Sequence, residues 1–296
     1  MLAILMAGIL ASCHSLAEYV NLGVQAQAYQ HNYLPDASQR NTGLALVALD
    51  TTKWRRQSEG IFARGVAVLW AQGNNASQLD AQLPLYHWHP LHGVWLGVHQ
   101  TQVNAESTLG ESQSYLGDGT SPVDIAADST VTSTWQRSRY QVFWRSDARY
   151  TGAANQAGLY WQRLTSPVEA ELTGFTPTLF DLESEGIGFF VGQHYDTRGW
   201  GFSWQLSLGM QTHLYSDSST QSHSISESER RMLALEAQTR WQYRYYLAPY
   251  WYLVPQLGLQ LQLLGQAKND SQNLSQKELS YATVFTGISL RRYFDF

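Results

Sequence analysis

Five arginines and one glutamate stand at alternating positions in two segments, 131–145 and 231–245, whose polar residues alternate with large apolar ones. Side chains two residues apart on a β-strand point to the same face, so each set shares one side of a sheet. The set comprises Arg137, Arg139, Arg145, Glu236, Arg240 and Arg244. Guanidinium groups beside a carboxylate form a structural ion-pair network, or guide anions if they line a channel. Their chemistry therefore depends on what the two segments enclose.

A second candidate is the histidine group His87, His89 and His92. Residues two apart on a strand share a face, so His87 and His89 could chelate a metal ion. No carboxylate or cysteine stands at a fixed spacing from them, and Pro90 marks a turn. Histidines beside Trp88 near a strand end are the favoured interpretation, and we predict no metal site.

The segment 103–130 carries five acidic residues and no Lys or Arg, which raises the question of calcium binding. The acidic residues are Glu106, Glu111, Asp118, Asp124 and Asp128. They lack the alternating spacing of a calcium loop. A solvated surface loop is therefore the favoured interpretation.

A hydrolase or acyltransferase needs a nucleophile, a histidine and an acid or amide brought close together. No such motif stands out, and pairs such as Ser222 and His223 are expected by chance in a chain with nine His. We predict no catalytic residues and no cofactor.

Composition limits the elements that can position these residues. The 296-residue chain is only 15% charged but 13% aromatic, and its mean hydropathy is −0.31. The only long apolar run, 2–11, is too short for a transmembrane helix, which needs about 20 apolar residues. The net charge of −5 and the lack of a basic tract argue against a nucleic-acid partner. A membrane β-barrel fits, because half of each strand faces a polar interior and keeps mean hydropathy low.

The segment 280–296 shows the two-residue period of a strand between unlike solvents. Its mostly apolar row is Ala282, Val284, Thr286, Ile288, Leu290, Phe294 and Phe296. Arg292 interrupts that row near the end, where a lipid-facing Arg costs about 0 to 1 kcal/mol. We expect Tyr281, Thr283, Gly287 and Ser289 to face inward. This pattern predicts a closing strand with its alternate face in lipid.

Similar segments recur along the chain and predict about twelve strands. They are 19–30, 42–49, 60–71, 82–88, 92–102, 131–145, 156–172, 182–194, 200–214, 231–245, 251–264 and 280–296, with a bulge expected at Pro167. Several hold their alternation for ten or more residues, whereas soluble strands average about five or six. We therefore predict an all-β fold, a single transmembrane antiparallel β-barrel spanning 18–296, over a soluble secreted β-sandwich. Lumenal partners for the arginines would be Glu236 together with Glu169, Glu171, Glu183 and Glu185.

The N-terminal segment 1–17 has the apolar core and small-residue end of a secretory signal peptide, although a positively charged start is missing. Cleavage after Ala17 would leave Glu18 first. The alternative is a lipoprotein box ending at Cys13, whose side chain would be acylated. The body of the chain then lacks cysteine, which suits the periplasmic route.

The long strands and the terminal Tyr293-Phe294-Asp295-Phe296 resemble the outer-membrane barrels of Gram-negative bacteria, and in size the chain is similar to autotransporter translocator barrels. The absence of an N-terminal passenger would make it like the solitary autotransporter-like barrels. This resemblance implies a location in the cell outer membrane, with lipid and lipopolysaccharide as surroundings. It also implies transient contact with the barrel-assembly machinery, which would read Phe294 and Phe296 as its signal.

The resulting functional prediction is a non-enzymatic barrel, either a narrow pore for small solutes or a structural and surface-interaction protein. An outer-membrane enzyme that acts on lipid or peptide is the alternative.

Overall fold

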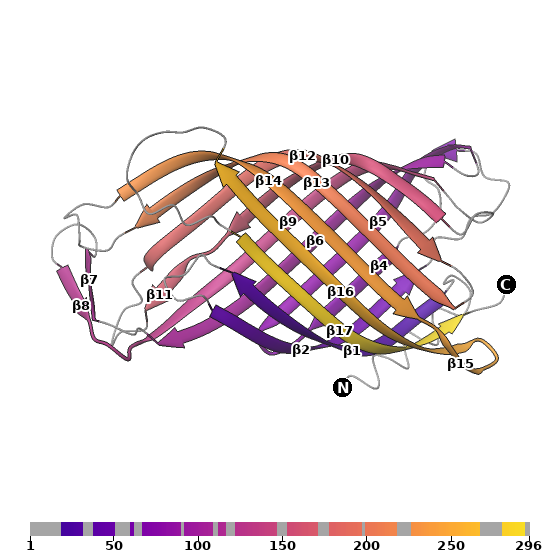
Figure 1. Ribbon diagram of the computed structural model, residues 1–296, viewed down its shortest axis with the longest axis horizontal. Helices are drawn as coiled ribbons and strands as arrows, with labels where there is room; N and C mark the ends of the chain where they lie inside the picture. The colour runs from indigo at the N-terminus through magenta and orange to yellow at the C-terminus, as the bar shows by residue number, and fades with distance from the viewer. Residues whose placement is uncertain are drawn as a thin grey trace.

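The computed structural model describes residues 19–31, 38–50, 60–61, 67–89, 92–108, 112–116, 122–146, 153–170, 178–196, 199–217, 226–266 and 280–293. Among these residues, twelve antiparallel strands form one closed ring, because β1 pairs with both β2 and β17. The inclined strands wrap around a single barrel (Figure 1). The prediction of an all-β barrel of about twelve strands is confirmed.

The wall follows the order of the chain. Its strands are β1 (Tyr19–His31), β2 (Ser38–Asp50), β4 (Ala67–Gln72), β5 (Ala76–His89), β6 (His92–Thr108), β9 (Thr130–Ser146), β10 (Ala153–Thr165), β12 (Thr178–Asp196), β13 (Trp200–Asp217), β14 (Ser226–Tyr243), β16 (Trp251–Gln266) and β17 (Ser280–Tyr293). Three short strands extend it: β3 (Gly60–Ile61) pairs with β5, β11 (Val168–Ala170) with β9 and β12, and β15 (Tyr245–Ala248) with β16.

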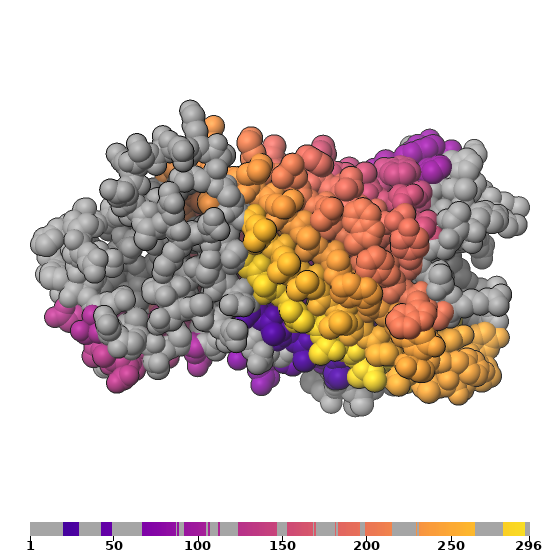
Figure 2. Space-filling model, in the orientation of Figure 1, coloured from indigo at the N-terminus to yellow at the C-terminus, as the bar shows by residue number. Residues whose placement is uncertain are grey.

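The two faces of each strand differ as the alternation predicts. On β14, Leu233 and Leu235 are exposed on the outside, while Met232, Ala234 and Glu236 are buried inside. On β17, Val284, Ile288 and Leu290 are exposed, and Tyr281, Thr283 and Ser289 are buried. The outside is therefore apolar and the inside is a mixed core. Figure 2 shows the side chains of β13, β14, β16 and β17 covering the wall continuously on one side.

The two ends of the barrel differ in their connections. Residues 90–91, 197–199 and 249–250 join strands at the end where Tyr19 and Tyr293 lie, whereas 109–129, 218–225 and 267–279 separate strands at the other end. The exceptions are 51–66 at the first end, which is long, and 73–75 at the second, which is short. Short periplasmic turns and longer extracellular loops are the rule for outer-membrane barrels, so the first is the periplasmic end. The prediction that 103–130 is a loop is wrong in part, because β6 runs to Thr108 and β7 (Gln113–Leu116) pairs with β8 (Pro122–Ile125).

Aromatic side chains gather at the periplasmic end. On the outer face, ring contacts join Trp200 with Tyr243 and Tyr243 with Tyr245, with centroids 4.7 and 4.4 Å apart. Arg292 lies over the ring of Trp251 at 5.2 Å. Amphipathic rings favour the boundary between lipid and water, so this girdle marks the membrane–water interface on the periplasmic side. Within the described residues, no helix is long and apolar enough to span a membrane.

Two predicted strands are interrupted. The segment predicted as one strand over 60–71 contains β3 and β4 as separate strands. The other, predicted over 156–172, ends as β10 at Thr165 and resumes as β11 after Pro167, with a register shift between Val168 and Glu169. Proline lacks the N–H that a ladder needs, which explains this break. The predicted leader 1–17, Cys13, Glu171, Phe294 and Phe296 lie outside the described residues.

Inward glycines make room for large lumenal rings. Phe285 of β17 lies directly across Gly258 of β16, where a Cβ atom would overlap the ring. Tyr160 of β10 lies over Gly188 and Gly209 on the next two strands of the wall, and a Cβ at Gly188 would lie 2.6 Å from the Tyr160 ring. Close approach of a ring to a neighbouring backbone requires glycine at these positions. The lumen is thus packed like a core.

Candidate functional site in the barrel lumen

The centre of the lumen holds an ion-pair network formed by Arg137 and Arg139 of β9 and Glu236 of β14. Glu236 accepts from Arg137 Nη2 at 2.5 Å and from Arg139 Nη1 at 2.9 Å, both on Oε2. Gln260 of β16 donates to the other carboxylate oxygen at 2.8 Å. The three charged side chains are 1 to 5% exposed. Burial of these charges is offset by their attraction and by additional hydrogen bonds to most of their remaining polar atoms.

Neighbouring side chains accept further hydrogen bonds from both guanidinium groups, although Arg139 Nε has no acceptor among the described residues. Arg137 donates through Nε and Nη2 to Gln162 Oε1 at 2.9 and 2.6 Å. Arg139 donates to Ser207 Oγ at 2.7 Å and lies over the ring of Tyr160 at 3.9 Å. The network therefore ties β9 and β10 to β13, β14 and β16 through the lumen.

One contact crosses the whole barrel. Arg137 Nη1 donates to the hydroxyl of Tyr281 on β17, and the ring of Trp135 meets that of Tyr281 at 5.4 Å. Strands β9 and β17 are six places apart in the ring of twelve, so they lie opposite each other. The side chains of the network thus cross the lumen, and the polar partners Gln162, Ser207 and Gln260 lie on the β10–β16 side.

An apolar cluster lies in the part of the lumen lined by β2, β4 and β6. Leu44 and Leu46 of β2, Ala71 of β4 and Val103 of β6 are buried and form one cluster with Tyr281. Beside it, Gln27 of β1 donates to Gln78 of β5 at 2.9 Å. Each of the twelve wall strands contributes at least one inward side chain that is 9% exposed or less. Together with the crossing contact, these side chains occupy much of the middle of the lumen.

Arg145, Arg240 and Arg244 lie toward the periplasmic end of the lumen, in less buried positions than Arg137 and Arg139. Arg145 donates to Gln82 at 3.2 Å, Arg240 lies over Phe285 at 5.0 Å, and Arg244 donates to Tyr293 at 3.0 Å. All six residues predicted to line the lumen therefore point inward, but only Arg137, Arg139 and Glu236 meet in one network.

Sequence reasoning missed Arg291, which is 4% exposed and donates to Asn21 at 2.8 Å and to Gln242 at 3.3 Å. The sequence held a signal for this residue: Arg291 stands an even number of positions from Tyr281 and Ser289, which were predicted to face inward. The predicted positions of two glutamates are wrong. Glu183 and Glu185 were expected in the lumen, but they lie on the outer face of β12, the face that also carries the exposed Ile187. Glu169 pairs with Thr132 on the outer face of β9.

A triad-like arrangement, also not foreseen, lies in the lumen on β5 and β6. Asp80 and His99 are directly opposite each other in the ladder, and Asp80 Oδ1 contacts His99 Nδ1. Thr101, two residues further along β6, has its hydroxyl 3.1 Å from His99 Nε2. With the proton on Nδ1, His99 donates to Asp80 and accepts from Thr101, which is the order of acid, base and nucleophile. Gln78 donates to the second oxygen of Asp80 at 2.8 Å.

The histidines weighed as a metal site lie at the periplasmic end. The ring of His92 stacks on Trp144 at 5.6 Å. The side chains of His87 and His89 lie outside the described residues, as do Ser222 and His223. Within the described part of the chain, no group of three or more His, Cys, Asp or Glu side chains is arranged to hold a metal ion.

No family model and no curated protein matches the chain. Solved structures that resemble it include the outer membrane protease OmpT from Escherichia coli, with 8% identity over 94% of this chain and 97% of that chain and a TM-score of 0.40. The translocator domain of the autotransporter NalP from Neisseria meningitidis has 7% identity over 99% and 95%, with a TM-score of 0.45. The NanC porin has 9% identity over 93% and 100%, with a TM-score of 0.34. These likenesses assign no activity.

The assignment to a membrane follows from the barrel itself. Large exposed apolar side chains cover the outside of the barrel, and aromatic side chains gather at one end. Among the described residues, the twelve strands close on themselves and leave no edge strand. A sheet closed on itself is the only β-structure that satisfies its backbone hydrogen bonds in hydrocarbon. The chain is a twelve-stranded transmembrane β-barrel of the outer membrane.

Proposed function

We propose that the protein is a non-conducting, non-enzymatic barrel that serves a structural and surface-interaction role in the outer membrane. The observation that carries this proposal is the contact between Arg137 and Tyr281 on opposite strands, with packed side chains on both sides of it. A narrow pore for small solutes needs a continuous path of water, and buried side chains interrupt that path. Twelve-stranded barrels are intermediate in size between filled eight-stranded barrels and open porins. Whether water can pass therefore depends on how the side chains pack in the lumen.

The partners proposed on this basis are outer-membrane lipid and lipopolysaccharide around the apolar wall, and the barrel-assembly machinery during insertion. The role proposed for Phe294 and Phe296 is to be read by that machinery. Membership of the solitary autotransporter-like group stays a prediction.

Osmotic swelling of proteoliposomes tests the role. Liposomes that contain the refolded barrel are placed in iso-osmotic arabinose, with protein-free liposomes and liposomes containing an open porin as controls. We expect the barrel to swell no faster than the protein-free liposomes. Swelling above that rate would contradict the proposal and would indicate a pore for small solutes.

A second candidate function is hydrolysis, which the alignment of Asp80, His99 and Thr101 specifically favours. The side chains of Asp80 and His99 keep 29% and 21% exposure, so water reaches them from the lumen. Thr101 itself is 8% exposed, which limits the substrate to a small acyl ester. In the reaction, the Thr101 oxygen would attack the acyl carbon while its proton passes to His99, the alcohol would leave, and water would then release the acid.

The hydrolase is tested with a chromogenic acetyl ester and the refolded barrel. If Thr101 is the nucleophile, Thr101→Val abolishes turnover while Thr283→Val, a buried lumenal threonine on the opposite side, leaves it unchanged. Turnover at the buffer rate by the wild type, or equal turnover by the Thr101→Val variant, removes this candidate.

A further inference from the structure

A row of polar side chains crosses four neighbouring strands on the outer face of the wall. The ladder pairs Arg163 of β10 with Glu185 of β12, Glu185 with Thr212 of β13, and Thr212 with Arg231 of β14. Residues paired directly across a ladder point to the same side of the sheet. The row lies near the extracellular ends of these strands, since β10 and β13 end at Thr165 and Asp217 and β12 and β14 begin at Thr178 and Ser226.

The next outward-facing row toward the periplasm is apolar. It consists of Ile187, Met210 and Leu233, which are 65%, 61% and 46% exposed and pair with one another across β12, β13 and β14. The outer face therefore changes from charged to apolar between two adjacent rows. Because a charge on the lipid face is costly at the midplane and tolerated near the interfaces, this step marks the boundary between acyl chains and headgroups in the outer leaflet.

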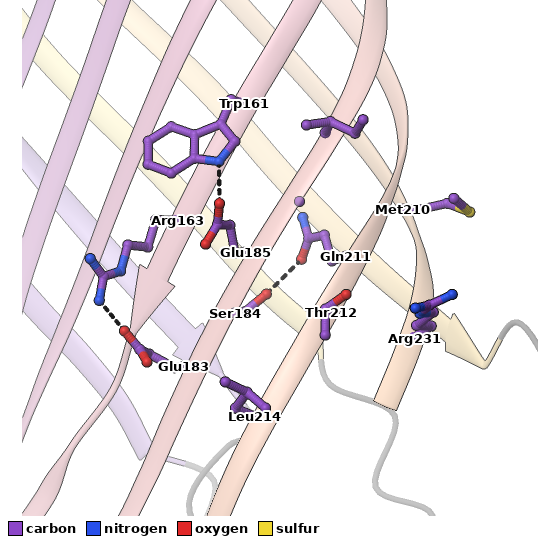
Figure 3. A pocket seen from close by; sticks show the side chains of 12 residues that line it. Trp161, Arg163, Glu183, Ser184, Glu185, Met210, Gln211, Thr212, Leu214 and Arg231 are labelled. Carbon is purple, nitrogen blue, oxygen red and sulfur yellow. Dashed lines mark hydrogen bonds and ion pairs between the residues drawn. The ribbon is translucent and has the colours of Figure 1, made fainter. Parts of the chain in front are cut away.

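A hollow of about 580 Å³ lies on this boundary. Figure 3 shows Trp161, Arg163, Glu183 and Glu185 on one side of it and Thr212 and Arg231 on the other. Glu183 is paired with Arg163, and Glu185 accepts from Trp161 Nε1 at 2.7 Å. Arg231 is exposed and has no hydrogen-bond or ion-pair partner among the described residues. The positive charge available to a ligand in this hollow is thus the Arg231 guanidinium, with the Thr212 hydroxyl beside it.

We propose that this hollow binds the headgroup of a phosphorylated glycolipid of the outer leaflet. Arg231 holds the phosphate through two N–H donors, the geometry in which arginine recognises phosphate best, and Thr212 donates to the same group. Acyl chains lie along the row of Ile187, Met210 and Leu233. This site faces lipid and is independent of the lumen.

The two glutamates select the sugar. Glu183 and Glu185 have free lone pairs that accept hydrogen bonds from hydroxyl or amide groups, and they repel a second bare anion. A headgroup with both a phosphate and several donors matches this arrangement better than a plain anionic phospholipid. Glu229 pairs with Leu214 one row further out on the same face, so its charge weakens the phosphate site.

The test is native mass spectrometry of the full barrel in detergent, with mono-phosphorylated lipid A, the same glycolipid without phosphate, and phosphatidylglycerol as probes. Loss of the guanidinium in Arg231→Ala should weaken binding of mono-phosphorylated lipid A about tenfold. Glu229→Gln should strengthen it, since it removes a nearby negative charge. Arg292→Ala, which removes an outward arginine at the periplasmic end, should leave it unchanged.

Equal binding by wild type and Arg231→Ala, or equal binding with and without phosphate, would overturn the site. Phosphatidylglycerol that binds as tightly as lipid A would overturn the glycolipid assignment. A lipid-free dimer that Arg231→Ala dissociates would show that a second copy of the chain covers the hollow, and would also overturn the proposal. Because Arg231 is exposed, these variants should fold, which a difference in gel migration between the unheated and the heated barrel can verify.

Discussion

Replacement of Glu236 by glutamine should destabilise the barrel more than any other single loss of charge in the described lumen. The change keeps the shape of the side chain but removes the charge that faces Arg137 at 2.5 Å and Arg139 at 2.9 Å. Removal of one partner from a buried ion pair costs about 3 to 5 kcal/mol, because the remaining charge stays buried without compensation. Here two guanidinium groups lose the same partner, so we expect the upper part of that range.

The measurement is equilibrium unfolding in urea of the barrel in lipid vesicles, followed by tryptophan fluorescence and extrapolated linearly to water. Glu106→Gln is the matched control, because Glu106 is exposed on β6 and the same chemical change should there have little effect. A double variant that also carries Arg139→Gln should recover part of the loss, since one uncompensated charge is removed with it. A free energy of unfolding for Glu236→Gln within about 0.5 kcal/mol of the wild type would refute the reasoning.

Two further predictions test the packing and the orientation of the wall. Gly258→Val should prevent the Phe285 ring from lying across β16 and should lower the unfolding midpoint, while Phe285→Ala in the same chain should restore part of it; a Gly258→Val variant with an unchanged midpoint would contradict the close approach. Leu206→Arg, on the outer face of β13, should cost about 2 to 4 kcal/mol in vesicle unfolding, whereas a value near zero would mean that this position does not face hydrocarbon.

The sequence predicts the wall well because each strand lies between two unlike environments. Leu233 and Leu235 alternate with Glu236 and its neighbours, and a shift of one residue would exchange lipid and core for the whole strand. The faces of β13, β14 and β17 follow from this period alone. The inward positions of the six charged residues discussed first follow from it as well.

The errors arise where alternation carries no information. Glu183 and Glu185 were assigned to the lumen by their charge, but charges are tolerated on the outer face near the headgroups, so polarity stops reporting the face at strand ends. The pairing of Asp80 with His99 depends on the register between two strands joined by a turn, which the pattern within each strand does not fix. The contact of Arg137 with Tyr281 depends on closure of the whole ring. Contacts across the lumen therefore required the structure.

The proposal that the barrel does not conduct is tested most directly by single-channel recording in a planar lipid bilayer that contains the refolded protein. Ions are the smallest probes, so their current reports any continuous path of water past Arg137 and Tyr281. The packing of the lumen predicts a flat baseline at 100 mV when insertion is verified by protease protection. Reproducible stepwise currents from the wild-type barrel would contradict a lumen closed by its own side chains.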